Sequence, residues 1–291
     1  MANTKVIRNK ILSITNTKKI TKTMEMVAIS KIKKIKSRLL VSQPYLFHIK
    51  TLISHFFNRK KKYSHILLKK EREIKNIGIL VVTSNRGLCG NLNHNVYKKI
   101  FNIMKTNHKD VVYHLYIFGL KGISFFKQKR NIYIKKMINT DDNIKYQQLI
   151  PFIKFIIQEY EENRIDKLLI VSNHCQNQIL QNSHIIQLLP LKEEIFFDQK
   201  YTKYSRWDYI YESKEKIILD TVFQSYMIFQ VFQLILENIL SEHSARMITM
   251  KTASDNSENI IKELGLLYNK TRQFSITQEL TEIISGSPVF C

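Results

Sequence analysis

The feature that most constrains the fold is a long stretch without proline, between Pro190 and Pro288. Alternate steps of three and four residues from Val222 to Phe274 reach apolar side chains towards both ends of this stretch and polar ones in its middle. This heptad pattern is typical of a helix that packs along a second helix. A helix from about Glu212 to Ser285 would hold about 74 residues and be about 110 Å long at 1.5 Å per residue. A compact domain of this size cannot bury such a helix along its length, so the pattern predicts an extended shaft.

The beginning of the chain shows the same periodicity. Steps of three and four residues from Ile7 to Phe56 again reach apolar side chains at both ends, with Lys18 and Glu25 near the centre. Pro44 would cost about 3 kcal/mol inside a helix, so we expect a kink or break just before it unless packing compensates. Two heptad helices at opposite ends of one chain, joined by a domain that reverses direction, are expected to pair as an antiparallel coiled coil.

The middle of the chain has a different period, because short β-branched runs alternate with helical stretches. This alternation predicts an α/β domain with a largely parallel, Rossmann-like sheet. The expected strands are 77–83, 111–118, 131–137 and 168–172, and the clearest helices are 95–105 and 149–161. The predicted organisation is a shaft helix at 1–58, an α/β domain at 75–200 and a second shaft helix at 210–286, with a lysine-rich solvated connector at 59–75.

Composition narrows the possible functions. The formal net charge of +22 would favour nucleic acid, an anionic membrane surface or an acidic protein partner. Abundant Lys, Ile and Asn beside scarce Gly and Pro could instead come from an AT-rich genome, which weakens the case for nucleic acid. Three widely separated cysteines support neither a disulfide framework nor a zinc site. The most apolar stretch, 217–240, contains too many polar residues to predict a membrane span.

The loop at 83–93 follows an expected strand and precedes an expected helix, a position that often binds phosphate. It lacks the third glycine of a dinucleotide fingerprint and the Gly-Lys-Ser/Thr of a P-loop. The alternative is structural, with positive φ angles at Gly87 and Gly90 and a helix cap at Asn91 or Asn93. We expect no bound nucleotide, cofactor or metal.

Two pairs of neighbouring residues suggest a nucleophile and a base, but neither has an evident third group to orient it. These are Cys89 with His94, and His174 with Cys175. A buried structural cysteine is the simpler interpretation of Cys89.

The polar residues within the heptad pattern are more informative, because a coiled coil loses stability at each of them. They are Lys18, Glu25, His243 and Arg246. Either they set the register of the paired helices, or this part of the shaft faces other proteins that surround it.

Three motifs carry a resemblance to a known family: IRNKILSITNTKKITKTMEMVAISK at 7–31, SNRGLCGNLN at 84–93, and the segment from SEHSARMITMKTASDN to the end of the helix at 241–286. With them the chain resembles the gamma subunits of bacterial-type F-type ATP synthases. The resemblance implies a non-catalytic rotor shaft, which couples proton flow through a membrane ring to ATP synthesis in surrounding head subunits.

The resemblance also implies partners and contact residues. The partners would be the alpha and beta head subunits, the epsilon subunit and the membrane c-ring, with no nucleic acid and no small-molecule substrate. The location would be peripheral, at the cytoplasmic face of the inner (plasma) membrane. The head contacts would be Met24, Arg246, Arg272, Gln273, Thr277 and the loop around Cys89, and the contacts with the ring and epsilon subunit would be Tyr209, Tyr211 and Glu212.

Alternatives remain at this stage. A nucleotide-dependent α/β enzyme would need a phosphate loop and catalytic carboxylates, and a basic coiled-coil nucleic-acid binder would need a clustered basic region before its heptads. For Arg272, the alternative to a head contact is a surface pair with Glu279 or contact with solvent alone.

Overall fold

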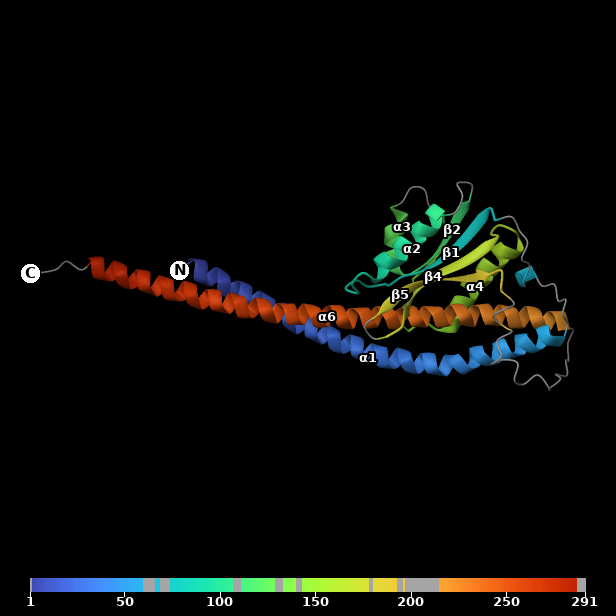
Figure 1. Cartoon of the computed structure of the whole chain (residues 1–291), viewed down its shortest axis with the longest axis horizontal. Coiled ribbons are helices and arrows are strands. Elements are labelled where there is room, and N and C mark those ends of the chain that lie inside the picture. The colour runs from blue at the N-terminus through green and yellow to red at the C-terminus, as the bar shows by residue number, and fades with distance from the viewer. Residues whose placement is uncertain are drawn as a thin grey trace, which may run out of the picture. The chain divides into compact units, whose positions relative to one another are not determined.

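The computed structural model describes the chain at residues 2–59, 66–68, 74–106, 111–128, 133–139, 143–177, 180–192, 196 and 215–286. In chain order the elements are α1 (Ala2–Arg59), the short 3₁₀ helix η1 (Ile66–Leu68), β1 (Asn76–Val82), α2 (Leu92–Thr106), β2 (Val112–Phe118), α3 (Leu120–Lys127), β3 (Tyr133–Ile138), α4 (Tyr146–Glu161), β4 (Lys167–Cys175), β5 (Gln181–Leu189) and α6 (Glu215–Gly286) (Figure 1). Contacts divide the chain into two compact units, Lys31–Ala245 and a second unit made by Met1–Ser30 with Arg246–Cys291.

The unit Lys31–Ala245 is built on a five-stranded sheet with the order β3-β2-β1-β4-β5. The first four strands in this order are parallel, and β5 joins the edge antiparallel to β4. The sheet confirms the largely parallel α/β prediction. The sequence pattern did not predict β5 or the short helix α3.

Alternate residues of the central strands pack on opposite faces of this sheet, as the period of two requires. In β1, Ile79 and Val81 join a core with α2 and α3, whereas Leu80 and Val82 join a core on the other face. This second core includes apolar residues of α4, of α1 from Ile35 onwards and of α6 up to Ile239. The sheet therefore lies between two helical layers (Figure 1).

The apolar part of α6 is a core helix of this unit. By length and composition alone, one window of α6 is apolar enough to cross a membrane. Its residues between Leu219 and Ile239 supply many side chains of the larger core, including the fully buried Phe223, Met227 and Val231. Packing against the sheet and α4 therefore explains why this stretch is so apolar.

α1 is one helix from Ala2 to Arg59, so Pro44 does not break it. The side chains around the proline pack well on α6: the Tyr45 and Phe229 rings lie 4.0 Å apart, and Leu46 is buried. This packing offsets the backbone hydrogen bond that a proline removes from a helix. The expected solvated connector is wrong in its described part, because Leu67 and Leu68 of η1 are buried.

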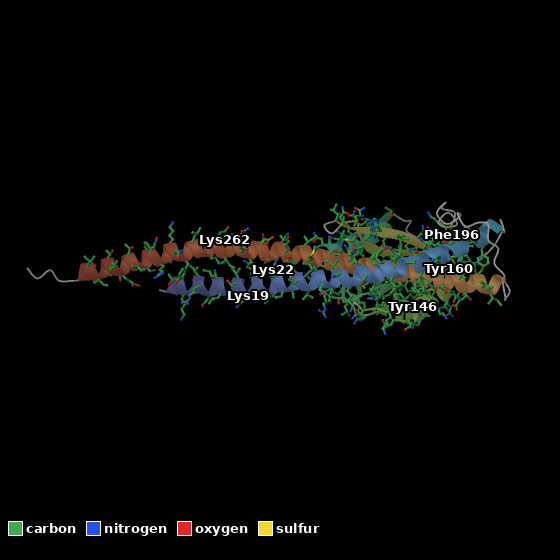
Figure 2. All side chains as sticks on the ribbon, turned by 90° about the horizontal axis from the view of Figure 1, so that it is seen from below. Lys19, Lys22, Tyr146, Tyr160, Phe196 and Lys262 are labelled. Atoms are coloured by element: carbon green, nitrogen blue, oxygen red, sulfur yellow. The ribbon has the colours of Figure 1, made fainter. Side chains whose placement is uncertain are left out.

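In the second unit, the first part of α1 and the last part of α6 lie side by side and run in opposite directions (Figures 1 and 2). Ala28 and Met250 are buried there, and Ser254 and Ser257 are buried beside them. The Lys18 Nζ lies 3.0 Å from Glu258 Oε2 and joins the two helices. The contact between the helices is therefore part apolar and part polar.

Two histidines of the sheet make the stability of the larger unit depend on pH. Burial, then the nearby His174 and Lys99, lower the pKa of His184, although Glu237 opposes this. Burial and Lys135 likewise lower the pKa of His114 against the effect of Glu159.

Because the unfolded chain then binds more protons, the free energy of unfolding should be highest above the ordinary histidine pKa of about 6.5 and fall as pH drops towards the lower folded values. Urea unfolding between pH 7.5 and 5.5 measures this fall. Replacing both histidines with glutamine should flatten it, and an unchanged slope would show that other groups cause it.

Candidate functional site

The last part of α6 presents polar side chains to its surroundings. Arg272, Gln273 and Thr277 are all exposed. The Thr277 hydroxyl donates to the Gln273 carbonyl of its own helix at 2.9 Å. Among the described residues Arg272 makes no ion pair, so a pair with Glu279 is absent from this part of the chain. Arg272 and Gln273 therefore both point outward, whereas the contact role of Arg272 stays a prediction.

Large apolar side chains accompany these polar ones. Phe274 is 70% exposed and Ile284 is 74% exposed, and Leu266, Leu280 and Ile283 are also exposed. Of these residues, Phe274 lies on the heptad pattern that predicted burial against a second helix. A concentration of large exposed apolar side chains favours a contact with another macromolecule. This end of α6 is therefore a candidate protein-interaction surface.

The first part of α1 carries a similar mixture. Met24 is 39% exposed, and Met26 and Val27 beside it are also exposed. Figure 2 labels Lys19 and Lys22 on this helix and Lys262 on α6. Lys262 pairs with Glu258 at 3.3 Å, and hydrogen bonds from Lys18 and from Lys262 lower the pKa of the Glu258 carboxyl. Exposed pairs like these contribute little to stability, so they leave the surface available for a partner.

The polar heptad positions differ in burial and in their partners. Glu25 is only 7% exposed and receives the Lys22 ammonium at 3.0 Å, and Lys18 pairs across to α6. His243 is buried in the larger unit, and Arg246 is half-buried. Lys18 thus has a partner on α6, which supports a role in register, whereas the pair of Glu25 with Lys22 lies within α1.

The loop after β1 satisfies its own polar groups. The Ser84 amide donates to the Asn93 side-chain oxygen at 3.1 Å, and the Asn93 amide group donates to the Ser84 hydroxyl at 2.7 Å. Asn93 therefore closes the loop and is not a helix cap. Gly90 has the expected positive φ, of 58°. The second positive φ in this loop, 63°, belongs to Leu88, so the prediction of a positive φ at Gly87 is wrong. The Ser84 backbone amide, which could have donated to a phosphate, already donates to Asn93.

Cys89 is a buried structural residue and not a nucleophile. It is 3% exposed and packs with Leu92 and Ala245, whereas His94 is exposed. Its burial means that a head contact of this loop would use a neighbour such as the exposed Leu88. Burial, with the nearby Cys89, raises the pKa of Tyr97 to about 12.

The second candidate pair also has structural partners. His174 Nδ1 lies 2.8 Å from Glu237 Oε2, and the Cys175 thiol donates to the Asn177 carbonyl at 3.1 Å. Across the described ranges, no group of three or more His, Cys, Asp or Glu side chains is arranged to hold a metal. The remaining predicted contacts, Tyr209, Tyr211 and Glu212, lie outside the described residues.

The protein thus has an α/β unit and two long helices, and its candidate sites in the described residues are surfaces for protein contacts. Solved structures share this fold. The rotor of the Euglena gracilis mitochondrial ATP synthase in rotational state 1 matches with a TM-score of 0.64 and 19% identity, over 94% of this chain and 99% of that one. The central stalk and c-ring structure of the Tetrahymena thermophila mitochondrial ATP synthase matches with a TM-score of 0.61 and 24% identity, over 81% and 99%.

Comparison of sequences gives the family. A family model described as ATP synthase matches residues 3–288. An ATP synthase gamma chain of Buchnera aphidicola subsp. Acyrthosiphon pisum (strain Tuc7) is 46% identical over 288 residues, which are 99% of this chain and 98% of the relative. A gamma chain of Buchnera aphidicola subsp. Schizaphis graminum (strain Sg) is 46% identical over 290 residues, with the same coverage. The chain belongs to the ATP synthase gamma-chain family. It is accordingly a non-catalytic subunit with a rotor-shaft role in this membrane-associated complex.

Proposed function

We propose that this chain couples proton passage through a membrane ring to ATP synthesis in the head subunits, at the cytoplasmic face of the inner (plasma) membrane. The observation that carries the proposal is the 46% identity to gamma chains over nearly the whole length. A shaft of this kind needs no catalytic groups of its own. It needs surfaces that bind partner subunits, and both helical segments of the second unit have exposed side chains that can do so.

The proposed contacts with the alpha and beta head subunits are Met24, Arg246, Arg272, Gln273 and Thr277. Four of these side chains are exposed and the fifth, Arg246, is half-buried, so each presents some surface to a partner. Exposed donors such as Arg272 form modest hydrogen bonds that can break and reform. Many modest contacts suit a shaft that meets several subunits in turn better than one tightly packed contact does.

The proposed contacts with the epsilon subunit and the c-ring are Tyr209, Tyr211 and Glu212, and they rest on the family resemblance. We also propose that the chain works as three parts, with shaft helices at 1–58 and 210–286 and an α/β domain at 75–200. The parallel sheet and its helices support the central part.

Reconstitution tests this function directly. The purified chain alone should show no ATP hydrolysis above the buffer blank, because the family is non-catalytic and the loop after β1 satisfies its own amide. Added to alpha and beta head subunits, it should support sustained ATP turnover, and it should co-purify with them from native membranes. Hydrolysis by the chain free of these subunits, or failure to join them, would reject the proposal.

A further inference from the structure

Large apolar and aromatic side chains are exposed on two helices of the unit Lys31–Ala245 and form what we name the α1–α4 surface. They are Leu40, Val41, Tyr45 and Phe47 of α1 and Tyr146 of α4. Val41 is 79% exposed, more than any other large apolar side chain among the described residues. Single apolar side chains are common on protein surfaces, whereas a group of them favours an interaction site.

Ring contacts connect the two helices of this surface. The Tyr45 ring and the Tyr146 ring both contact Phe229 of α6, at centroid distances of 4.0 and 5.2 Å (Tyr146 is labelled in Figure 2). Val41 lies four residues before Tyr45, on the same side of α1. The exposed side chains are therefore continuous from α1 to α4. Because these rings are already packed, a partner would not have to order them on binding, which lowers the cost of association.

The α1 part of the surface has a defined direction. Leu40, Pro44 and Phe47 are separated by four and three residues, so they lie along one face of the helix over about 10 Å. Lys33 and Lys36 lie seven and four residues before Leu40 on the same face, and both are exposed. Neither lysine makes an ion pair with another described residue. The face thus changes from cationic to apolar along its length.

The neighbouring sequence does not balance these positive charges. The chain has 24 acidic residues, and none of them lies in the parts of the three helices that form or adjoin the surface, 31–59, 146–158 and 221–236. A partner that carries negative charge beside apolar side chains would therefore complement this face in both respects.

Two other occupants fit less well. A second copy of the chain would bring its own Lys33 and Lys36 to a symmetric contact, where like charges repel. A lipid surface binds an amphipathic helix more tightly as more apolar area is buried, and a strip of two helical turns offers little.

We propose that the α1–α4 surface binds an amphipathic helix of a partner protein whose polar side is acidic. A helix presents apolar side chains at every third or fourth residue, which matches the spacing of Leu40, Pro44 and Phe47. A partner helix of about 15 residues would reach from Phe47 to Lys33 and bring its carboxylates to the lysines. The surface is separate from the contacts proposed above, so it adds a binding site in the unit Lys31–Ala245 to the proposed function.

Site-specific photo-crosslinking in the assembled complex tests this proposal. A photoreactive benzoylphenylalanine replaces Val41 in the full-length chain, native membranes are irradiated, and mass spectrometry identifies the crosslinked segment. We expect a crosslink to an amphipathic helix with an acidic polar side. The same probe at Leu180, which is 56% exposed in the same unit and lies outside the surface, should not crosslink to that helix.

Charge reversal tests the role of the lysines. Lys33→Glu combined with Lys36→Glu should lower the crosslink yield at position 41 by about tenfold or more, because attraction becomes repulsion. The matched control combines Lys98→Glu with Lys105→Glu, at exposed positions of α2, and should lower the yield by less than about twofold. Thermal melting of the free subunit should show both double variants folded like the parent, since all four lysines are exposed.

Several results would overturn the proposal. A crosslink only to a second copy of the chain, only to lipid, or to a helix with a basic polar side would reject it, and so would equal yields from the two double variants. If position 41 gives no crosslink while the chain still joins the head subunits, the surface is rejected and the proposed function stands.

Discussion

Replacing Gly119 with alanine should destabilise the larger unit by about 3 to 5 kcal/mol. Gly119 directly follows β2 and has a φ of +100°, which side chains other than glycine rarely adopt. A Cβ built there would lie 2.3 Å from the carbonyl oxygen of Thr83 and 2.8 Å from its hydroxyl. The backbone cannot move aside easily, because the Gly119 amide donates to Ile138 and the Thr83 amide donates to Phe118.

Gly265→Ala is the matched control for this change. Gly265 lies within α6, and a Cβ there would meet nothing within 4 Å. Alanine should therefore stabilise its helix by up to about 1 kcal/mol. Urea unfolding followed by circular dichroism measures both variants. If Gly119→Ala stayed within 1 kcal/mol of the parent chain, the turn between β2 and α3 would be far more adaptable than its hydrogen bonds indicate.

Arg272→Glu should reduce ATP-driven proton pumping of the reconstituted complex by about tenfold while leaving the isolated chain folded. The Arg272 side chain is exposed on α6 beside Gln273, so in the proposed complex it can donate to carboxylates or carbonyls of a head subunit. Loss of one charged hydrogen bond costs about 1.5 to 3 kcal/mol, and a like charge placed opposite a carboxylate adds repulsion. An exposed substitution alone changes folding stability by only about 0.5 kcal/mol.

Lys270→Glu makes the same change of charge two residues earlier, at another exposed position of α6 outside the proposed contacts. It should pump at nearly the parent rate. Thermal melting of the free subunit accompanies both pumping assays. Normal pumping by Arg272→Glu would reject the contact role, and a large fall in its melting temperature would show that Arg272 supports folding instead.

The sequence predicted most of the helices and parallel strands because their side-chain periods are strong. Apolar residues three and four apart predicted α1 and α6, and β-branched runs predicted β1, β2 and β4. It missed β5, whose residues such as Asn182, Ser183 and His184 lack a clear apolar run. It also missed α3, an eight-residue helix that contains Gly122. Both are held by tertiary contacts, which periodicity does not report.

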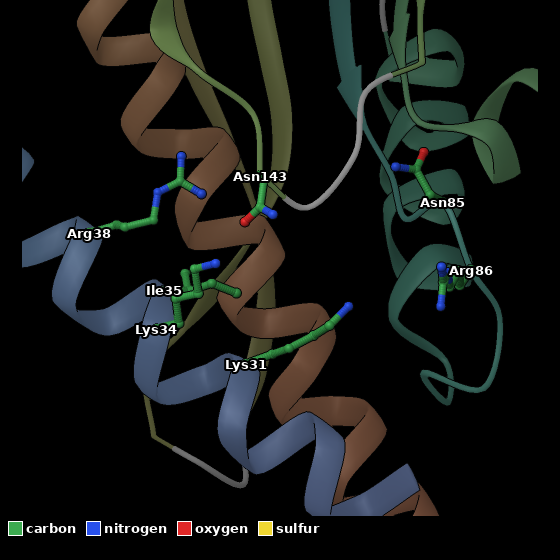
Figure 3. Close-up of a pocket in the computed structure, with 7 residues that line it drawn as sticks. All are labelled: Lys31, Lys34, Ile35, Arg38, Asn85, Arg86 and Asn143. Atoms are coloured by element: carbon green, nitrogen blue, oxygen red, sulfur yellow. The ribbon is translucent and has the colours of Figure 1, made fainter.

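The candidate sites were predictable only in part. Heptad spacing places Arg272 off the apolar side of α6, and the structure confirms its exposure. The same spacing gave no sign that Phe274 would be exposed, because that depends on how far α1 extends beside it. A hollow between α1 and the loop after β1 was equally hidden, since it is lined by Lys31, Lys34 and Arg38 and by Arg86, at least 48 positions further along the sequence (Figure 3). Separation along the chain removes such a site from any local pattern.

The polar contacts between α6 and the sheet have a mechanical consequence. Asn238 of α6 accepts from the Asn173 backbone amide at 3.1 Å and from its side-chain amide at 2.9 Å, and Asn173 in turn accepts from the Ser183 hydroxyl at 2.8 Å. All three residues are buried. An apolar interface alone would let a helix slip or turn about its own axis at modest cost, whereas this one must first break buried hydrogen bonds. Asn173 and Asn238 therefore hold α6 to the sheet, so that a torque on the helix is transmitted to the sheet unless these buried hydrogen bonds break.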